Sequence, residues 1–363
     1  MISNPDETFL NQGRLDKNIN IQDNAEYTWG DHSLRFGGLY QAFRVEPYQN
    51  FGVVPTYTIG VGTNTPQIST AQFTNAGLFP GGISTGQRTT ANNLLALMGG
   101  IVSAGSATFN VATQNSGFLP NQGVFNKFAY ENYAAYVTDQ WRVRPNLTLN
   151  FGLRYDLYTP VRETQGIFLE PAIGPNQDPV QAVLDPNGQF QFIGGNAGGN
   201  NKLYKTDKNN FAPSLSFAYT PSFKDKFFGS IFGDGKTVIR GGYSISYVND
   251  DFVVSGAANT IGLNAGLSTT NNAINPATGT TSLNARADSL PAIATPAFGT
   301  FPRPFAAYNT AAFNFFNTVF GVDPHLQTPS VAQYNFGFQR EIGFQTAIEI
   351  RYVGARSNNL KVC

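Results

Sequence analysis

The sequence of 363 residues is poor in the side chains that build disulfides and metal centres. Its single cysteine, Cys363, stands at the last position, so no internal disulfide can form. Its two histidines, His32 and His325, are far apart and have no cysteine or histidine beside them at metal-ligand spacing. We therefore expect no disulfide scaffold, no bound metal and no cofactor.

Charge is also scarce in this chain. Charged residues make up 13% of it, about half of the usual share of roughly 25%. The 23 basic and 23 acidic residues balance to a net charge of zero, and no basic run occurs. Because nucleic-acid binding depends on clustered positive charge, the composition excludes a nucleic-acid partner.

No apolar run is long enough for a membrane helix. The longest, residues 94–102 (LLALMGGIV), is far shorter than the roughly 20 residues that such a helix needs. We expect this run to form a short helix that packs its own loop. The first residues, MISNPD, also lack the basic and apolar segments of a signal peptide, so an exported protein with this start is expected to be a fragment or to have a misplaced start.

Glycine, aromatic and uncharged polar residues are abundant instead, with 38 Gly, 31 Phe and 16 Tyr. This aromatic content argues against an intrinsically disordered chain. Several stretches alternate between apolar and polar residues, most regularly at 147–156. There the apolar set is Leu147, Leu149, Phe151, Leu153 and Tyr155, and the polar set is Thr148, Asn150, Gly152, Arg154 and Asp156. A period of two places the sets on opposite faces of a β-strand.

Such stretches predict eight strands. They cover residues 18–29, 33–45, 132–141, 147–158, 210–220, 236–249, 333–342 and 346–355. The connections between them are alternately short and long, and the long ones are residues 46–127, 159–208 and 250–330. Connections of this length with little regular pattern are abnormal in a compact soluble domain.

This organisation favours a membrane β-barrel over a soluble sandwich. Strands with one apolar and one polar face occur in two settings. They form either a soluble sheet that covers an apolar core or a membrane barrel with lipid outside and a water-filled lumen. Outer-membrane barrels have short periplasmic turns and long outer loops, whereas a sandwich has no reason to place every long connection at one end. The predicted fold class is all-β, a transmembrane antiparallel β-barrel. Connections of this length are unusually long for an eight-stranded barrel, so we expect the chain to form part of a larger barrel.

Aromatic residues at strand ends support this prediction. Trp29 and Trp141, the two tryptophans, each end a strand that runs into a short turn. Tyr155, Tyr247 and Tyr352 are expected at the opposite ends. Together they predict aromatic girdles at the two membrane interfaces, where a ring has one end in lipid and the other in water.

The second face of the strands carries the charges. An arginine that faces lipid near the midplane costs roughly 2–4 kcal/mol, so this face is expected to line the lumen while the aromatic face contacts outer-membrane lipid. The predicted lumen-facing residues are Asn150, Arg154, Asp156, Arg240, Glu349 and Arg351.

No group of residues indicates catalysis. Glu131, Asp139, Asp156, Glu163 and Glu349 lie on separate strands or loop edges, without paired-carboxylate spacing or a nearby histidine. We therefore predict that the chain is not an enzyme.

Other candidate features have plainer interpretations. His32 is expected to be a solvated turn residue, and Asp139 is expected to bond the turn at residues 142–146. The glycine-rich run at 194–201 lacks the strand and helix that flank a phosphate loop, and we expect a flexible loop.

Five stretches carry a resemblance to a known family. They are GDHSLRFGGLYQAFR (30–44), NYAAYVTDQWRVRPNLTLNFGLRYD (132–156), NNFAPSLSFAYTP (209–221), GDGKTVIRGGYSISY (233–247) and TPSVAQYNFGFQREIGFQTAIEIRYVGARSNNL (328–360). In this order they resemble the large TonB-dependent outer-membrane receptors of the Oar-like kind. The most specific part is Asp-x-Trp at 139–141 followed by Leu-Thr-Leu-Asn-x-Gly-Leu-Arg-Tyr at 147–155.

The resemblance implies a barrel of about 22 strands, of which about eight are present, around an N-terminal plug. A carboxypeptidase-regulatory-like domain often precedes the plug, and a TonB box links the receptor to the inner-membrane TonB complex. None of these segments is recognisable here, and the chain reaches Cys363 without a terminal aromatic strand. We expect an internal barrel fragment in the Gram-negative outer membrane, whose contact with TonB runs through the missing plug.

The function implied by the resemblance is energised uptake of a large or scarce nutrient. The long loops are the expected contact with this unknown extracellular substrate, and their Asn, Thr and aromatic content suits a glycan or a peptide. A surface adhesin or structural barrel without transport remains an alternative, as does a passive porin. An upstream plug and TonB box would separate the receptor from both.

Overall fold

The computed structural model describes residues 11–62, 65–74, 77–223, 226–249, 264–274, 285–290, 292–305 and 319–360. Eight long strands follow one another in a single antiparallel sheet. They are β1 Gln12–Trp29, β2 His32–Gln49, β7 Phe128–Arg144, β8 Leu147–Tyr158, β12 Phe211–Tyr219, β13 Thr237–Tyr247, β16 Ser330–Gly343 and β17 Thr346–Asn358. All eight predicted strands and the all-β class are confirmed. The chain start, Cys363 and parts of the predicted loop 250–330 lie outside the described residues.

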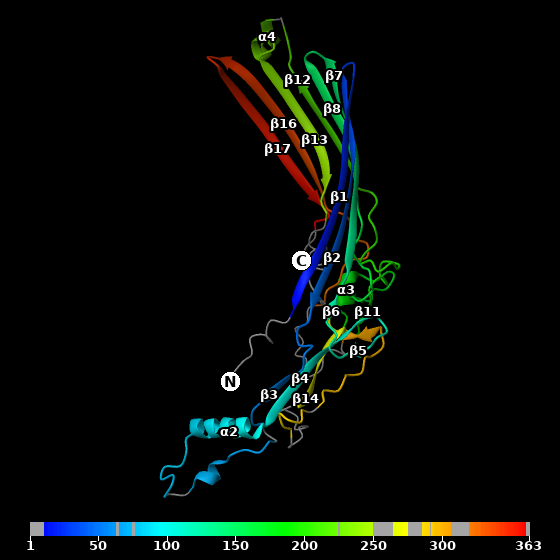
Figure 1. Cartoon of the computed structure of the whole chain (residues 1–363). Helices are drawn as coiled ribbons and strands as arrows, with labels where there is room; N and C mark the ends of the chain where they lie inside the picture. Colours follow the sequence, from blue (N-terminus) through cyan, green and yellow to red (C-terminus); the bar gives the residue numbers. More distant parts are fainter. Residues whose placement is uncertain are drawn as a thin grey trace.

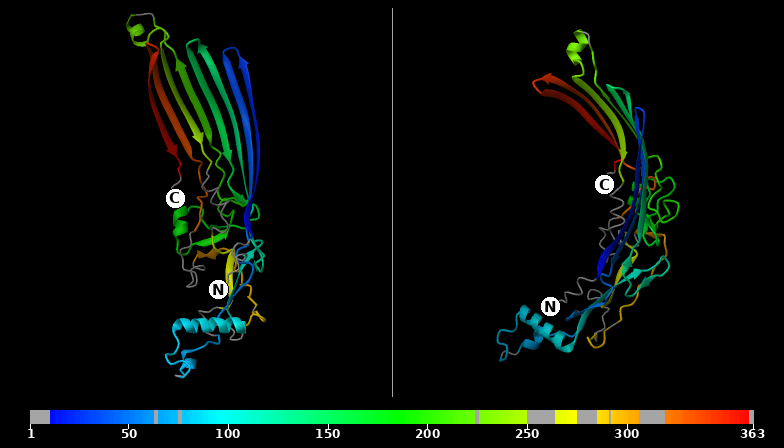
Figure 2. Two further views of the ribbon diagram at one scale, coloured as in Figure 1. Left: turned by 60° about the vertical axis from the view of Figure 1, so that its left-hand side comes forward. Right: turned by 45° about the horizontal axis from the view of Figure 1, so that its top comes forward.

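The eight strands form a curved wall rather than a closed barrel (Figures 1 and 2). Strands β1 and β17 are its edges, and within the described residues neither pairs with a further strand. The hairpin turns of β1–β2, β7–β8 and β16–β17 lie at one end of the wall, and the long connections lie at the other (Figure 1). We call these the short-connection end and the long-connection end.

Several strands are longer than the alternation predicts. Strands β1 and β2 have 18 residues each and pair along their whole length. Strand β7 continues to Arg144, so the turn predicted at 142–146 is wrong and only Pro145 and Asn146 form it. A β-bulge between Arg142 and Arg144 keeps these residues in the sheet while it interrupts the alternation that marks a strand.

The register keeps alternate residues on a common face across the wall. Val137, for example, lies opposite Phe36 on one side and Leu153 on the other. No described part of the chain covers this aromatic face, and these three side chains are 43–44% exposed. Rings meet across neighbouring strands, as in the pair Tyr40 and Tyr133, whose centroids are 5.2 Å apart. Such cross-strand pairs stabilise a sheet that has no second layer.

The long connections contain more regular structure than expected. They hold β3 Thr56–Ile59, β4 Val102–Val111, β5 Phe118–Leu119, β6 Val124–Phe125, β9 Arg162–Glu163, β10 Leu169–Pro171, β11 Gln189–Phe192, β14 Ser268–Ile274, β15 Arg303–Pro304, η1 Thr70–Phe73, α2 Thr85–Gly99 and α3 Pro179–Leu184. Strand β4 pairs with β3, β5 and β14, and β11 pairs with β10 and β15. Because partners such as β4 and β14 come from different connections, the three connections form one structure.

The helix predicted at residues 94–102 has the wrong bounds. This run holds the end of α2 and the first residue of β4. Helix α2 starts earlier because Ser84 and Gln87 form a capping box, in which the Gln87 N–H donates to the Ser84 hydroxyl. Gly100, at φ 58°, ends the helix. The buried Asn92 accepts a hydrogen bond from the Ile68 N–H at 2.7 Å, so α2 does pack against its own loop, as predicted.

The remaining helix, α4 Lys226–Phe232, lies at the short-connection end between β12 and β13 (Figure 1). No described helix is long and apolar enough to cross a membrane.

The apolar core lies mainly at the long-connection end and not along the wall. Its largest cluster of buried residues consists of Val45, Phe128, Val161, Phe168, Ile193, Leu203 and Tyr204. Only Val45 and Phe128 of this set belong to the long strands. The long connections therefore have a core of their own, while the wall depends on strand pairing.

The open edges of the wall predict how the isolated chain behaves. Strands β1 and β17 present backbone groups that neither lipid nor a described neighbour satisfies. We expect the isolated chain of 363 residues to aggregate in water and to show no heat-modifiable migration in detergent gels. Heat-modifiable migration like that of a closed control barrel would contradict this prediction.

Candidate functional site

The polar face of the wall brings together the residues predicted to line the lumen. The register places Arg240 opposite Gly337, and Gly337 opposite Arg351, while Glu349 lies opposite Gln339. All six predicted residues fall on this face. Asn150 Nδ2 donates to the Ser216 hydroxyl at 3.2 Å, and Arg240 Nη2 donates to Gln339 Oε1 at 3.3 Å. The face thus presents amides and charges in rows across neighbouring strands.

Asp156 differs from the other five because it is buried. Its residue is 3% exposed, and Arg154 holds its carboxylate with Nη2 at 2.8 Å and Nε at 2.9 Å. The expectation that Asp156 opens to water is therefore wrong. Arg154 and Asp156 are two residues apart on one strand, so both side chains lie on the same side of the sheet. There the guanidinium shields the carboxylate from water.

A charged group stands where the wall meets the long connections. Glu131 on β7 accepts from Arg44 on β2 at 2.6 Å and from Arg162 on β9 at 2.7 Å. The Glu131 N–H donates to the Thr159 hydroxyl at 2.6 Å. Glu131 is 5% exposed, so this ion-paired carboxylate is largely removed from water. Sequence spacing could not reveal the group, because its members come from three separate segments.

Buried carboxylates also hold the connection at 159–208. Glu163 is fully buried and accepts from the N–H groups of Lys127 and Ile167 at 2.8 and 2.6 Å. Burial raises its pKa above the ordinary value, against the lowering effect of these hydrogen bonds.

Glu170 anchors the glycine-rich run at 194–201. Its Oε1 accepts from the Asn196 N–H at 2.9 Å and from Gln191 Nε2 at 3.2 Å. Asn196 Nδ2 donates to the Pro171 carbonyl at 2.7 Å. The run is a loop, as predicted, but these hydrogen bonds attach it to Glu170 and Pro171. Burial raises the pKa of Glu170 to about 7.

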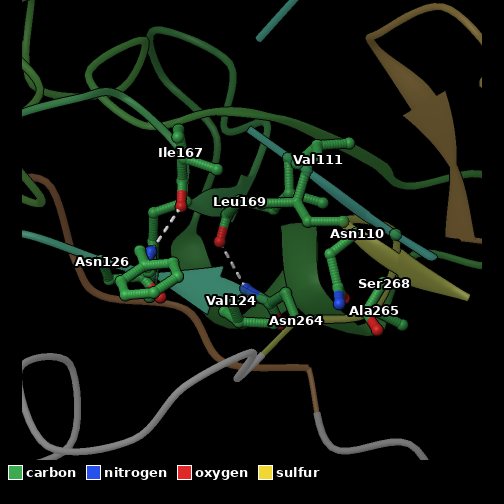
Figure 3. A pocket seen from close by; sticks show the side chains of 13 residues that line it. Asn110, Val111, Val124, Asn126, Ile167, Leu169, Asn264, Ala265 and Ser268 are labelled. Atoms are coloured by element: carbon green, nitrogen blue, oxygen red, sulfur yellow. Dashed lines mark hydrogen bonds between the residues drawn. The ribbon is translucent and has the colours of Figure 1, made fainter. Parts of the chain in front are cut away.

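A cavity lies where the long connections meet (Figure 3). The space in it that water-sized molecules can occupy is about 90 Å³. Asparagine amides join the connections around it. Asn126 Nδ2 donates to the Ile167 carbonyl at 2.8 Å, and Asn264 Nδ2 donates to the carbonyls of Leu169 and Phe320 at 2.7 and 2.8 Å. These bonds make the long-connection end a connected platform.

One lining residue leaves an acceptor free. Asn110 Nδ2 donates to the Gln122 carbonyl at 2.7 Å, but its Oδ1 is buried without a partner among the described residues. An oxygen of this kind favours a bound hydrogen-bond donor, because a buried acceptor without one is costly.

At the short-connection end, His32 and Asp139 form a hydrogen bond that the sequence interpretation missed. His32 Nδ1 lies 2.7 Å from Asp139 Oδ2. The imidazole stacks between Trp29 and Trp141, at centroid distances of 6.0 and 5.2 Å. The expectation that Asp139 bonds its own turn is wrong, whereas the His32 side chain is 33% exposed and stays partly solvated beside the indoles. Strand register places His32 opposite both indoles, a relation that requires knowledge of the pairing.

The predicted girdle tyrosines lie in different settings. Tyr155 packs against Phe211 with ring centroids 4.9 Å apart, and its hydroxyl donates to the Lys208 carbonyl at 3.1 Å. Tyr247 ends β13 at the long-connection end. Tyr352 lies in the middle of β17, so its predicted place at a strand end is wrong. That strand continues to Asn358, beyond the end predicted from alternation.

No group of three or more His, Cys, Asp or Glu residues in the described part of the chain could hold a metal ion. His325 contacts Lys205 and Asp323 rather than other candidate ligands.

A comparison with known protein families agrees with this architecture, in which the sheet has an aromatic and a polar face, short turns at one end and long connections at the other. The sequence matches the outer membrane beta barrel domain over residues 2–363. The chain belongs to this family. Its place is therefore the Gram-negative outer membrane, and the open wall is part of a barrel.

Comparisons with individual proteins add little to this assignment. No curated protein matches the chain. Among solved structures, the copper transporter OprC is similar to 90% of this chain at 10% identity, with a TM-score of 0.31. The chain spans 27% of the length of OprC.

The Glu131 group predicts a local change when it is disrupted. Replacing Glu131 with alanine leaves Arg44 and Arg162 without their shared carboxylate, at a cost of about 2 kcal/mol. We expect faster limited proteolysis in residues 159–208 of the full-length parent protein, with heat-modifiable migration retained. Glu349→Ala, at an exposed site on the wall, is the control and should leave cleavage unchanged. Equal cleavage of both variants and wild type would contradict the assignment.

Glu170 predicts a pH dependence of the same connection. Its folded pKa of about 7 exceeds the ordinary 4.5, so its contribution to stability is full below 4.5 and is lost as the pH rises through 7. We expect cleavage near Asn196 to be roughly tenfold faster at about pH 8 than at about pH 5 after correction for protease activity. Glu170→Gln should abolish this difference, and the partly exposed control Asp185→Asn should keep it. A pH dependence that survives Glu170→Gln would refute the role.

Proposed function

We propose that this chain supplies wall strands and outer loops to an energised outer-membrane receptor of the TonB-dependent, Oar-like kind. The aromatic face contacts lipid, and the face with Arg154, Arg240 and Arg351 lines the lumen. The long-connection end faces the exterior, and the short-connection end faces the periplasm. The role is transport rather than catalysis.

The observation that carries this proposal is the joining of the long connections. Strand β4 pairs with β14, β11 pairs with β15, and Asn264 bonds the carbonyls of Leu169 and Phe320. A joined platform with its own core presents a pre-organised surface to a substrate, because little ordering remains to oppose binding. A passive pore has no need of such a platform at its mouth.

The platform also suits the proposed substrate class. The cavity between the connections is lined by Phe125, Phe168 and Asn110, whose Oδ1 has no partner among the described residues. A glycan or a peptide offers the matching hydroxyls or amides. Energy from the inner membrane would reach the site through a plug and TonB box elsewhere in the parent protein.

Uptake by the full-length parent protein tests this function. Cells that carry it are given fluorescein-labelled oligosaccharides and peptides, with and without a functional TonB complex. We expect uptake of one probe class that stops when TonB is removed. Binding without uptake would favour the adhesin, and uptake that is independent of TonB would favour the porin.

A substitution in the platform tests whether its hydrogen bonds are needed for probe binding. Asn264→Ala removes the side-chain bonds to Leu169 and Phe320, and we expect roughly tenfold weaker probe binding. The exposed Asn187→Ala, in another long connection, is the control and should bind as wild type does. Unchanged binding by Asn264→Ala would separate the platform from substrate recognition.

A further inference from the structure

The cavity between the long connections has a buried hydrogen-bond acceptor in its wall. Asn110, on β4, lines this cavity and is 2% exposed. Its Nδ2 donates to the Gln122 carbonyl, and because a carbonyl only accepts, that bond fixes the orientation of the amide. Oδ1 is therefore the atom that is buried without a partner among the described residues. A buried acceptor of this kind is costly unless a bound group donates to it.

The space beside this oxygen is larger than a single water needs. A water fits once about 10–15 Å³ is accessible to it, whereas about 90 Å³ is accessible here. The small residues Ala265 and Gly266 line the cavity, so little side-chain volume fills it. Because protein interiors are normally close-packed, this much space favours a bound group of several non-hydrogen atoms over a lone water.

The strand register brings a hydroxyl beside Asn110. Ser268, the first residue of β14, lies directly opposite Asn110 on β4. Opposite residues of an antiparallel pair extend from the same face of a sheet, and both of these side chains line the cavity (Figure 3). A hydroxyl can donate as well as accept. The two residues therefore offer a ligand one acceptor and one donor side by side.

The other walls of the cavity are largely apolar and carry no charge. Val111, Ile167 and Leu267 are aliphatic, and no charged residue lines the cavity in the part of the chain that the structure describes. Residues 50–126, which include Asn110, contain a single charged residue, Arg88. A charged ligand group would lose its hydration here without gaining a counter-ion. The cavity therefore suits a neutral group that is partly apolar and has both a donor and an acceptor.

An aromatic ring lies at the edge of this cavity. Phe125 lines the cavity although it is 49% exposed, so it marks the opening. Tyr48 holds its ring in a parallel stack with centroids 6.0 Å apart. The negative face of an aromatic ring attracts the polarised C–H groups along one side of a sugar ring. A peptide backbone has no such row of C–H groups, so this feature favours a sugar over a peptide.

We infer that the cavity binds the acetamido group of a neutral N-acetylated sugar. The acetamido N–H donates to Asn110 Oδ1, its carbonyl accepts from the Ser268 hydroxyl, and its methyl group lies against the aliphatic walls. The sugar ring that carries the group packs on Phe125. The inference rests on the proposed function, because it narrows the substrate of the long-connection end from a glycan or a peptide to one class of glycan.

Saturation-transfer difference NMR with the detergent-purified full-length parent protein tests the site. The probes are N,N′-diacetylchitobiose, cellobiose, which has hydroxyls in place of the acetamido groups, and the neutral peptide N-acetyl-alanyl-alanine amide. We expect the acetyl methyl protons of diacetylchitobiose to receive the strongest saturation and cellobiose to bind roughly tenfold more weakly. Equal binding of cellobiose, preference for the peptide, or saturation concentrated on other protons would each overturn the inference.

Two variants separate recognition of the acetamido group from a structural role. Asn110→Leu keeps the size and branching of the side chain but removes Oδ1, and it should weaken diacetylchitobiose binding roughly tenfold while cellobiose binding stays the same. Ser268→Ala, at an exposed position, should weaken it roughly fivefold. Ser106→Ala, on β4 but outside the cavity, is the matched control and should bind as wild type does.

Unchanged binding in both cavity variants is the result expected if the cavity holds only water, and it would overturn the inference. Equal weakening in Ser106→Ala would do the same. Ser268→Ala lies at the surface, so a folding defect in Asn110→Leu does not prevent the test.

The outcome is separable from that of the proposed function. TonB-dependent uptake of a probe without discrimination between diacetylchitobiose and cellobiose would overturn the acetamido site alone. Acetamido-dependent binding that is lost in Asn110→Leu, without energised uptake, would overturn the receptor function alone.

Discussion

Continuous backbone pairing across the wall is the constraint on which the remaining structure depends. A strand in lipid has no water to satisfy its N–H and C=O groups, so each strand must pair along its length. The ladder from β1 to β17 meets this requirement over eight strands and leaves only the outer edges open. The same pairing sets which side chains meet, because a shift of one residue would exchange the faces. The Trp29–His32–Trp141 stack follows from that register.

The strand pairing has different consequences at the two ends of the wall. At the short-connection end, tight turns bring aromatic and ionisable side chains of neighbouring hairpins into contact. At the long-connection end, the strands carry chain segments that fold on one another around Phe128, Val161 and Phe168. The wall lacks a second layer, so stable packing exists only where the connections supply it. In the proposed function, recognition and membrane anchoring are thereby separated along the strand axis.

Prediction from sequence succeeded where periodicity carried the signal. Leu147, Phe151 and Asp156 fall on the faces that alternation assigns, and every predicted strand exists. It failed where the signal depends on partners distant in the chain. The contacts of His32 were missed because Trp141 and Asp139 are remote in sequence. The long connections looked irregular because β4 pairs with β14, which lies in a different connection. Bulges and helix caps, at Arg142–Arg144 and Ser84, moved element boundaries that apolar runs alone could not locate.

The pairing of β4 with β14 has a consequence for the order of assembly. Thr108 and Thr270 bond at 3.0 Å although 162 positions separate them. Closing a loop of that size is slow compared with forming adjacent hairpins, and its entropic cost is met only after the intervening strands are in place. We therefore expect the platform to be completed after the wall. A nascent barrel would pass through a stage with an intact wall and an unformed mouth.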